Sequence, residues 1–179
     1  AISNPVPCSN SDFWAKMNKM IKDHCAFCAA YYKEDIMADS IFKDKTLLIT
    51  GGTGSFGHTV LKHFLSTDIG EIRIFSRDEK KQDDMRHELQ ANHPQYAGKV
   101  KFYIGDVRNP QSIRDAMPGV NYILHAAALK QVPSCEFFPM PAAQPNIIGT
   151  DNVLHAAIAA SVDRHVCLST DQPAQPIKA

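Results

Sequence analysis

The chain has 179 residues, which is enough for one ordinary domain with an appendage and too short for two full domains. Its 19 Lys and Arg residues balance 19 Asp and Glu residues, so the charge favours neither a nucleic-acid partner nor an anionic membrane surface. No apolar run approaches the roughly 18 to 20 residues of a membrane span, and the first residues lack a signal peptide's pattern. We therefore expect a cytoplasmic protein without a membrane span.

Residues 1–40 are predicted to form a helical extension with a connector. Apolar residues recur at intervals of three and four between Phe13 and Tyr32, which is typical of one face of an amphipathic helix. The following stretch from Lys33 to Ser40 is polar and suits a connector. A lone helix of this kind needs a partner for its apolar stripe, so we expect it to dock on the following domain or on another chain, which leaves a homo-oligomer open.

The five cysteines predict reduced thiols rather than a metal site. Cys135 and Cys167 fall in the body of an intracellular type of fold. Cys25 and Cys28 have a spacing that zinc or a redox pair could use, but only Cys8 lies nearby as a further ligand. We therefore favour small apolar residues on a helix and predict no metal.

Residues 41–179 show short β-branched or apolar runs that alternate with longer segments of helical character, which is the pattern of βαβ units. We therefore predict an α/β fold with a doubly wound parallel sheet of the Rossmann type. The predicted strands are Thr46–Thr50, Glu71–Ser76, Val100–Ile104, Tyr122–Ala126 and His165–Ser169. The predicted helices are Phe56–Ser66, Glu79–Asn92, Gln111–Met117 and Asn146–Ala160.

The first predicted strand runs directly into a glycine-rich turn and a helix. Gly51 can permit a tight turn, Gly54 lets the backbone approach a pyrophosphate, and Gly57 lets the helix pack closely on the strand. The free N–H groups at the helix start would then face the phosphates. The alternative is an ordinary strand-to-helix loop, but the strand context favours a nucleotide cofactor.

The end of the second predicted strand bears on the choice between NADP and NAD. Ser76, Arg77 and Lys80 can form a pocket for the 2′-phosphate of NADP, because Arg offers a planar fork of donors. Asp78 leaves NAD as the less favoured cofactor, since a carboxylate there would suit free ribose hydroxyls. The alternative for this segment is the solvated start of a charged helix.

Two further strand ends support a cofactor site. Asp106 follows the third strand, where it can accept a hydrogen bond from an adenine amino group while the backbone lines the ring. Small residues from Ala126 to Ala128 end the fourth strand and permit the close approach of a flat cofactor, although such a cluster also serves helix-to-sheet packing.

Five segments resemble the extended short-chain dehydrogenase/reductase superfamily and, within it, the UDP-N-acetylglucosamine 4,6-dehydratases of bacterial surface-polysaccharide and nonulosonate biosynthesis. They are FKDKTLLITGGTGSFG, IRIFSRDEKKQDDMR, KFYIGDVR, HAAALKQVPSCEF and CLSTD. The resemblance covers Ile41 to Ala179, and the run LKQVPSCEF is specific to this family rather than to Rossmann domains in general.

The resemblance implies an NADP-dependent lyase acting on a UDP-sugar. Hydride leaves C4 of the sugar, a proton leaves C5, water is eliminated across C5 and C6, and hydride returns to C6. Thr170 and Asp171 match the start of the catalytic segment, and Asp171 would protonate the departing C6 hydroxyl. The residues that match cofactor-binding positions are Gly51, Thr53, Gly54, Ser55, Phe56, Gly57, Ser76, Arg77, Lys80, Asp106, Val107, Ala126, Ala127 and Lys130.

Three departures from the family pattern affect catalysis. Gln172 stands where the family has the Lys that takes the C5 proton, and Pro145 precedes the Asn of the fourth βα segment where a Thr is usual. The family's Tyr or Met with its following Lys, and its C-terminal substrate region, would come after Ala179. We therefore expect a truncated Rossmann domain that binds cofactor but is inactive or incomplete as a dehydratase. The alternative is a non-catalytic binding or assembly module that docks through its N-terminal helix.

Overall fold

The structure is a computed structural model and describes residues 41–129 and 132–168. The predicted helix between Phe13 and Tyr32, its connector and the Cys25 and Cys28 pair lie outside the described residues. The fold of the described part is given below.

The described residues form one parallel sheet with the strand order β3-β2-β1-β4-β5. The strands are β1 (Thr46–Thr50), β2 (Glu71–Ser76), β3 (Val100–Ile104), β4 (Tyr122–His125) and β5 (Arg164–Cys167). Residues 47–50 of β1 are all buried, because the central strand of such a sheet is covered on both faces. β5 is an edge strand in the described part, and Arg164 and Cys167 at its two ends are exposed.

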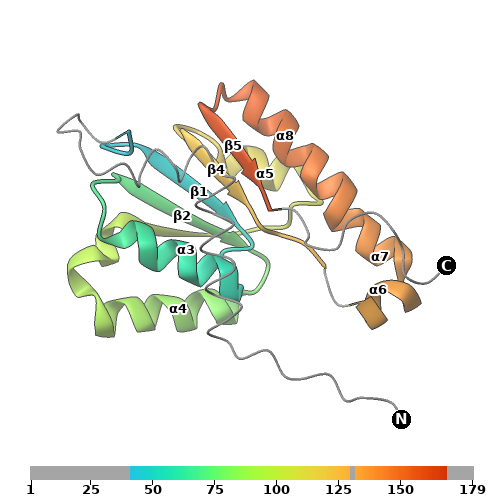
Figure 1. Cartoon of the computed structure of the whole chain (residues 1–179), viewed down its shortest axis with the longest axis horizontal. Coiled ribbons are helices and arrows are strands. Elements are labelled where there is room, and N and C mark those ends of the chain that lie inside the picture. The colour runs from blue at the N-terminus through green and yellow to red at the C-terminus, as the bar shows by residue number, and fades with distance from the viewer. Residues whose placement is uncertain (1–40, 130–131, 169–179) are drawn as a thin grey trace, which may run out of the picture. The chain divides into compact units, whose positions relative to one another are not determined.

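Helices cover both faces of the sheet, as the predicted doubly wound fold requires. Right-handed crossovers place α3 and α4 over one face and α5 and α8 over the other, and Figure 1 shows these two pairs on opposite sides of the strands. The helices are α3 (Ser55–Leu65), α4 (Glu79–Asn92), α5 (Pro110–Ala116), α6 (Val132–Phe137), α7 (Pro139–Ala143) and α8 (Thr150–Ala159). A 3₁₀ segment, η1 (Pro94–Lys99), precedes β3, and a π-helical segment, η2 (Gln144–Gly149), joins α7 to α8.

The core consists of apolar side chains from the strands and from the inner faces of these helices. Leu48, Phe75 and Ile123 of the sheet belong to one buried cluster with Ile113 of α5 and Val153 of α8. Because burial of each such side chain contributes about 1.5 to 3 kcal/mol, this cluster holds α5 and α8 firmly on the sheet.

The predicted elements are confirmed, with differences at several boundaries. β4 ends at His125 rather than Ala126, and β5 spans Arg164–Cys167 rather than His165–Ser169, where Ser169 lies outside the described residues. The prediction of one regular α-helix over Asn146–Ala160 was wrong in its first turn, because the chain adopts the π-helical segment η2 there. Pro145 lacks an N–H and crowds the preceding turn, and a widened turn accommodates both defects.

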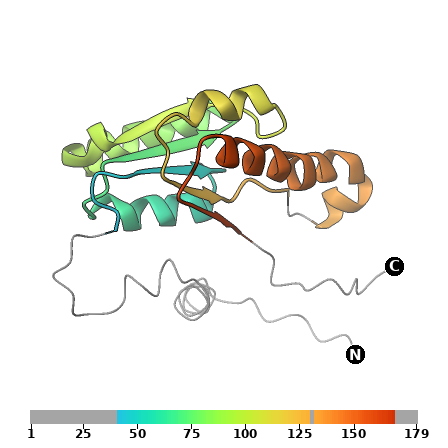
Figure 2. The ribbon, with the colours of Figure 1, turned by 90° about the horizontal axis from the view of Figure 1, so that it is seen from above.

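Helices α6 and α7 were not predicted from the sequence. Figures 1 and 2 show α6, α7 and α8 following one another in a run that reaches beyond the carboxyl ends of the strands. Pro139 begins α7, where proline is favourable because the first N–H of a helix has no partner within the helix.

The strand order reverses between β1 and β4. The chain moves outward from β1 to β2 and β3, then returns to the other side of β1 with β4 and β5. In open sheets of this kind, the crevice outside the carboxyl ends of the strands at the reversal is where ligands bind.

Candidate nucleotide-binding site

The turn after β1 lies at this reversal and depends on Gly51. Gly51 has a φ of 70°, in the left-handed region that favours glycine. A Cβ there would also lie 2.8 Å from the carbonyl oxygen of Ala126 and from the amide nitrogen of Ala127. The end of β4 therefore passes directly against the turn, and only a residue without a side chain fits between them.

Helix α3 starts against the same turn through Gly57. A Cβ at Gly57 would collide with the carbonyl oxygen and Cα of Gly52, so the helix approaches the turn at backbone distance. The predicted packing role of Gly57 is thus present in the structure. Thr53 and Phe56 are half-buried in this segment, while Gly54 and Ser55 are exposed.

The N-terminus of α3 has unsatisfied donors. Gly54 is its N-cap residue and provides no side-chain hydrogen bond, and the first turn contains no acidic residue. The first amides of an α-helix have no intrahelical acceptors, and the helix dipole adds partial positive charge at this end. Because Gly54 and Ser55 are exposed, an anion can reach these amides.

At the end of β2, the side chains predicted to hold a 2′-phosphate divide into buried and exposed ones. Ser76 is buried, and its hydroxyl accepts a hydrogen bond from Gln82 Nε2 at 3.0 Å. Arg77 and Lys80 are exposed, with 54% and 86% of their side-chain surfaces accessible. The structure thus brings two cations to this strand end, while the hydroxyl and the carbonyl of Ser76 both accept from Gln82.

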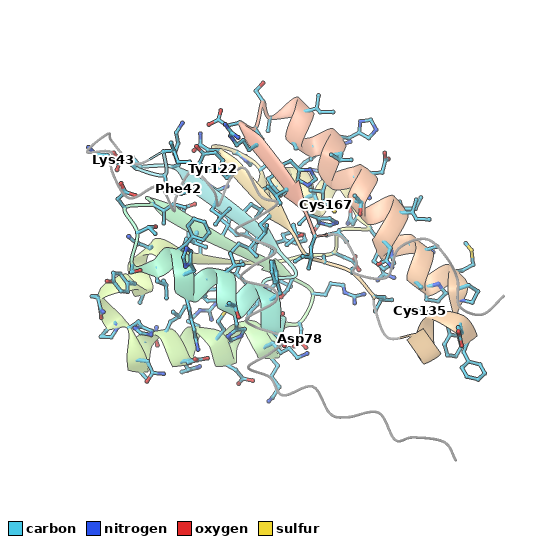
Figure 3. The ribbon with its side chains drawn as sticks, viewed as in Figure 1. Phe42, Lys43, Asp78, Tyr122, Cys135 and Cys167 are labelled. Carbon is cyan, nitrogen blue, oxygen red and sulfur yellow. The ribbon has the colours of Figure 1, made fainter. Side chains whose placement is uncertain are left out.

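Asp78 has a structural role that the sequence analysis did not predict. It caps α4 at the N-terminus, and its Oδ1 accepts a hydrogen bond from the backbone N–H of Lys81 at 3.0 Å (Figure 3). This backbone hydrogen bond lowers the pKa of Asp78 below its ordinary value. One lone pair of the Asp78 carboxylate is therefore used by the helix, so this carboxylate is less available to accept a hydrogen bond from a ribose hydroxyl.

At the end of β3, Asp106 is held by cations on both sides. Its Oδ1 accepts from the backbone N–H of Arg108 at 2.9 Å, and its Oδ2 accepts from Arg108 Nε at 2.9 Å. Arg77 Nη1 lies 3.8 Å from the same Oδ2. The side-chain hydrogen bond from Arg108 lowers the pKa of Asp106, which keeps it an anion with lone pairs still free to accept. The next residue, Val107, is buried in the core.

The end of β4 forms the opposite wall. Ala126 and Ala127 are half-buried beside Gly51, and the chain then continues to Leu129. Asn146 of η2 fixes this stretch, because its Oδ1 accepts from the backbone N–H of Leu129 and its Nδ2 donates to the carbonyl of Leu129, both at 2.9 Å. The small side chains of Ala126 and Ala127 add little bulk at the carboxyl ends of β1 and β4.

Sequence reasoning missed His125, the last residue of β4. Its ring is 2% exposed and lies between two hydroxyls, with Nδ1 2.6 Å from Thr50 Oγ1 and Nε2 3.1 Å from Thr150 Oγ1. Burial, and to a smaller extent the nearby His165, lower its pKa to about 4. A histidine directly before the small residues of a strand end was the available signal, but its partners come from distant parts of the chain.

Residues 47–179 match the family described as "Polysaccharide biosynthesis protein". The chain belongs to that family. The chain is similar to a protein of Rickettsia rickettsii named UDP-glucose 4-epimerase, with 62% identity over 143 residues. That match covers 78% of this chain and 40% of the relative, so the chain spans about two fifths of the length of such curated relatives.

Solved structures share the fold of this chain. Pen from Bacillus thuringiensis is 38% identical, with a TM-score of 0.66 over 71% of this chain and 37% of that chain. DesIV from Streptomyces venezuelae, a dTDP-glucose 4,6-dehydratase solved with NAD, is 22% identical with a TM-score of 0.57 over 67% of this chain and 36% of that chain. Taken with the sheet order, these matches show a Rossmann-like α/β fold, of which this chain covers a little over a third of each neighbour's length.

The residues predicted for catalysis lie outside the described residues. These are Thr170 and Asp171. Gln172 and the predicted cofactor ligand Lys130 also lie outside the described residues.

Within residues 41–129 and 132–168, no group of three His, Cys, Asp or Glu side chains could hold a metal ion. In the same part of the chain, no helix is both long and apolar enough to cross a membrane. Cys135 and Cys167 are free thiols on separate elements (Figure 3).

Proposed function

We propose that this chain binds NADP at the carboxyl ends of β1, β2, β3 and β4. The observation that carries the proposal is the uncapped N-terminus of α3, which follows the Gly51 turn at the point where the strand order reverses. A pyrophosphate site requires N–H donors without partners, the positive end of a helix dipole and a backbone that the ligand can approach closely.

The residues around the turn fit a dinucleotide. Gly51 and Gly57 bring β1, β4 and α3 to backbone distance, and Gly54 and Ser55 at the start of α3 are exposed. Ala127 on the opposite wall adds little bulk. When bound, the cofactor would take hydride from a substrate alcohol and return it later, whereas the protein binds it, orients it and excludes water.

The charges at the end of β2 support NADP over NAD. NAD-binding domains of this type place a free carboxylate there to accept from the ribose hydroxyls, but Asp78 already caps α4. Arg77 is exposed at the same strand end, and Lys80 projects from the first turn of α4. A guanidinium can hold a 2′-phosphate through two parallel hydrogen bonds.

The substrate that we propose is a UDP-N-acetylhexosamine, converted by 4,6-dehydration in an enzyme that contains this domain. The support is the resemblance of LKQVPSCEF and CLSTD to UDP-N-acetylglucosamine 4,6-dehydratases. Gln172 occupies the position of the family's C5 base, and an amide cannot accept that proton at neutral pH. We therefore propose that this chain retains the cofactor without completing the elimination.

A second candidate is 4-epimerisation of a UDP-sugar, which the name of the 62% identical Rickettsia rickettsii relative favours. Both reactions begin with hydride removal at C4, so the same cofactor site would serve either. They differ in the product, since epimerisation conserves mass and dehydration removes one water.

The test is calorimetric titration of the full chain with NADP and with NAD, followed by incubation with UDP-N-acetylglucosamine and mass spectrometry. We expect NADP to bind more tightly than NAD and the substrate mass to stay unchanged. Loss of one water would overturn our interpretation of Gln172, and chromatographic separation of an isobaric sugar would support the epimerase. If neither nucleotide binds, the cofactor proposal is wrong.

A further inference from the structure

We infer that His125, protonated at Nε2 and neutral, is a positioning residue that fixes the loop after β4 through Thr150 and Asn146. The inference rests on the proposed function, because this loop forms one wall of the proposed NADP site. His125 itself is buried, so its ring is not exposed to a ligand at that site. It acts through a chain of hydrogen bonds that joins β1, β4, α8 and η2.

The hydroxyl of Thr150 determines which ring nitrogen of His125 carries the proton. Thr150 Oγ1 donates its one hydrogen to the carbonyl oxygen of Asn146 at 2.8 Å. It can therefore only accept from His125, so Nε2 is the N–H that donates across 3.1 Å.

The other side of the ring follows from this assignment. A neutral imidazole protonated at Nε2 has an unprotonated Nδ1, which accepts the hydroxyl hydrogen of Thr50 at 2.6 Å. Every polar atom of the ring is then satisfied without a charge. Burial disfavours the charged form, and the neighbouring His165 ring, 6.1 Å away between centroids, disfavours it further.

The same hydroxyl continues the connection toward the loop. Thr150 holds the carbonyl of Asn146 within the π-helical segment, and the Asn146 side chain bonds both backbone groups of Leu129. These two hydrogen bonds engage both the N–H and the carbonyl of Leu129, as a pair of β-ladder bonds would. They therefore fix the position and the orientation of the backbone at Leu129. Residues 126–128 are thus held between His125 at one end and Leu129 at the other.

The two hydroxyls supply a matched pair of variants. Thr150→Val keeps the side-chain shape and removes the bonds to His125 and Asn146, whereas Thr50→Val removes the bond to the opposite nitrogen of the same ring. His125→Gln can place an amide donor near Nε2, whereas His125→Asn reaches only toward Nδ1. The readouts are hydrogen exchange of the Leu129 amide in the nucleotide-free full chain, the NADP dissociation constant, and thermal unfolding.

We expect Thr150→Val and His125→Asn to speed exchange at Leu129 and to weaken NADP binding, each by about three- to tenfold, as for the loss of a buried neutral hydrogen bond. Thr50→Val and His125→Gln should leave both quantities within about twofold, even where the melting temperature falls. A merely structural role would move exchange and affinity in step with stability in all four variants.

Equal effects of Thr50→Val and Thr150→Val at Leu129 would overturn the inference, as would equal effects of the two His125 variants. The exchange measurement needs no nucleotide. If the wild-type chain does not bind NADP, the proposed function fails, and exchange at Leu129 alone decides whether His125 positions the loop.

Discussion

The buried neutral His125 predicts a specific loss of stability in mild acid. Its pKa is about 4 in the folded chain and 6.5 in its ordinary state. Between these values the unfolded chain binds a proton that the folded chain does not, so the free energy of unfolding falls as the pH falls from 6.5 to about 4. At about 1.4 kcal/mol for each pH unit, the full interval corresponds to a loss on the order of 3 kcal/mol.

The assay is urea unfolding of the wild-type chain and of His125→Gln at closely spaced pH values. Asp78 and Asp106 also have lowered pKa values, so the stability they contribute is lost as the pH falls below the ordinary carboxyl range. Both proteins share those carboxylates and His165, so the difference between the two curves isolates His125. The difference should change by on the order of 3 kcal/mol between pH 6.5 and 4 and stay flat above pH 7. A flat difference throughout would refute a neutral buried ring.

Substitutions at three further positions test other parts of the proposed site. Gly57→Ala should lower the free energy of unfolding by roughly 1 to 3 kcal/mol in urea, because its Cβ would collide with Gly52, and a wild-type value would contradict that packing. Arg77→Ala should weaken NADP by about tenfold or more in calorimetry while NAD changes by less than about twofold, and equal losses would remove the selectivity argument. Asp78→Asn should keep the melting temperature and the NADP preference, since Asn also caps helices, whereas Asp78→Ala should lower the melting temperature. A gain of NADP over NAD in Asp78→Asn would show that the wild-type carboxylate takes part in cofactor choice.

Much of the fold followed from the sequence because local pattern and burial agree in the strands. The run Thr46–Thr50 is apolar and leads directly into Gly51, and the structure has the strand with the same bounds and a left-handed glycine after it. The same agreement fixed Glu71–Ser76 and Val100–Ile104. The apolar run is continuous in the central strand β1, which is buried on both faces, whereas β2 and β3 include the charged residues Arg73 and Lys101.

The elements that escaped the sequence analysis depend on proline and on distant contacts. Pro139 reads as a helix breaker, yet it begins α7 at the one place where a missing N–H has no cost. The widened turn at Pro145 cannot be read from an apolar repeat of three and four. His125 likewise draws its partners from Thr50 and Thr150, residues 75 and 25 positions away, so no local pattern identifies it.

Part of the candidate site could be predicted because some of its residues act through local backbone geometry. The glycines act through their own backbone, so Gly51 and Gly57 were identifiable from their spacing together with the preceding strand and the following helix. The charged residues at the strand ends were harder, because their partners decide their roles. Asp78 turned toward the helix that it caps, and Asp106 is shared by Arg77 and Arg108.

If NADP binds across the carboxyl ends of β1, β2, β3 and β4, amide chemical-shift mapping of the full chain should show which residues it contacts. On titration with NADP, the account predicts the largest shifts at residues 51–57, with further shifts at Arg77 and at residues 126–128. NAD should reproduce the shifts at the turn with a smaller change at Arg77. Saturation without a response at residues 51–57, or shifts confined to another surface, would contradict the account.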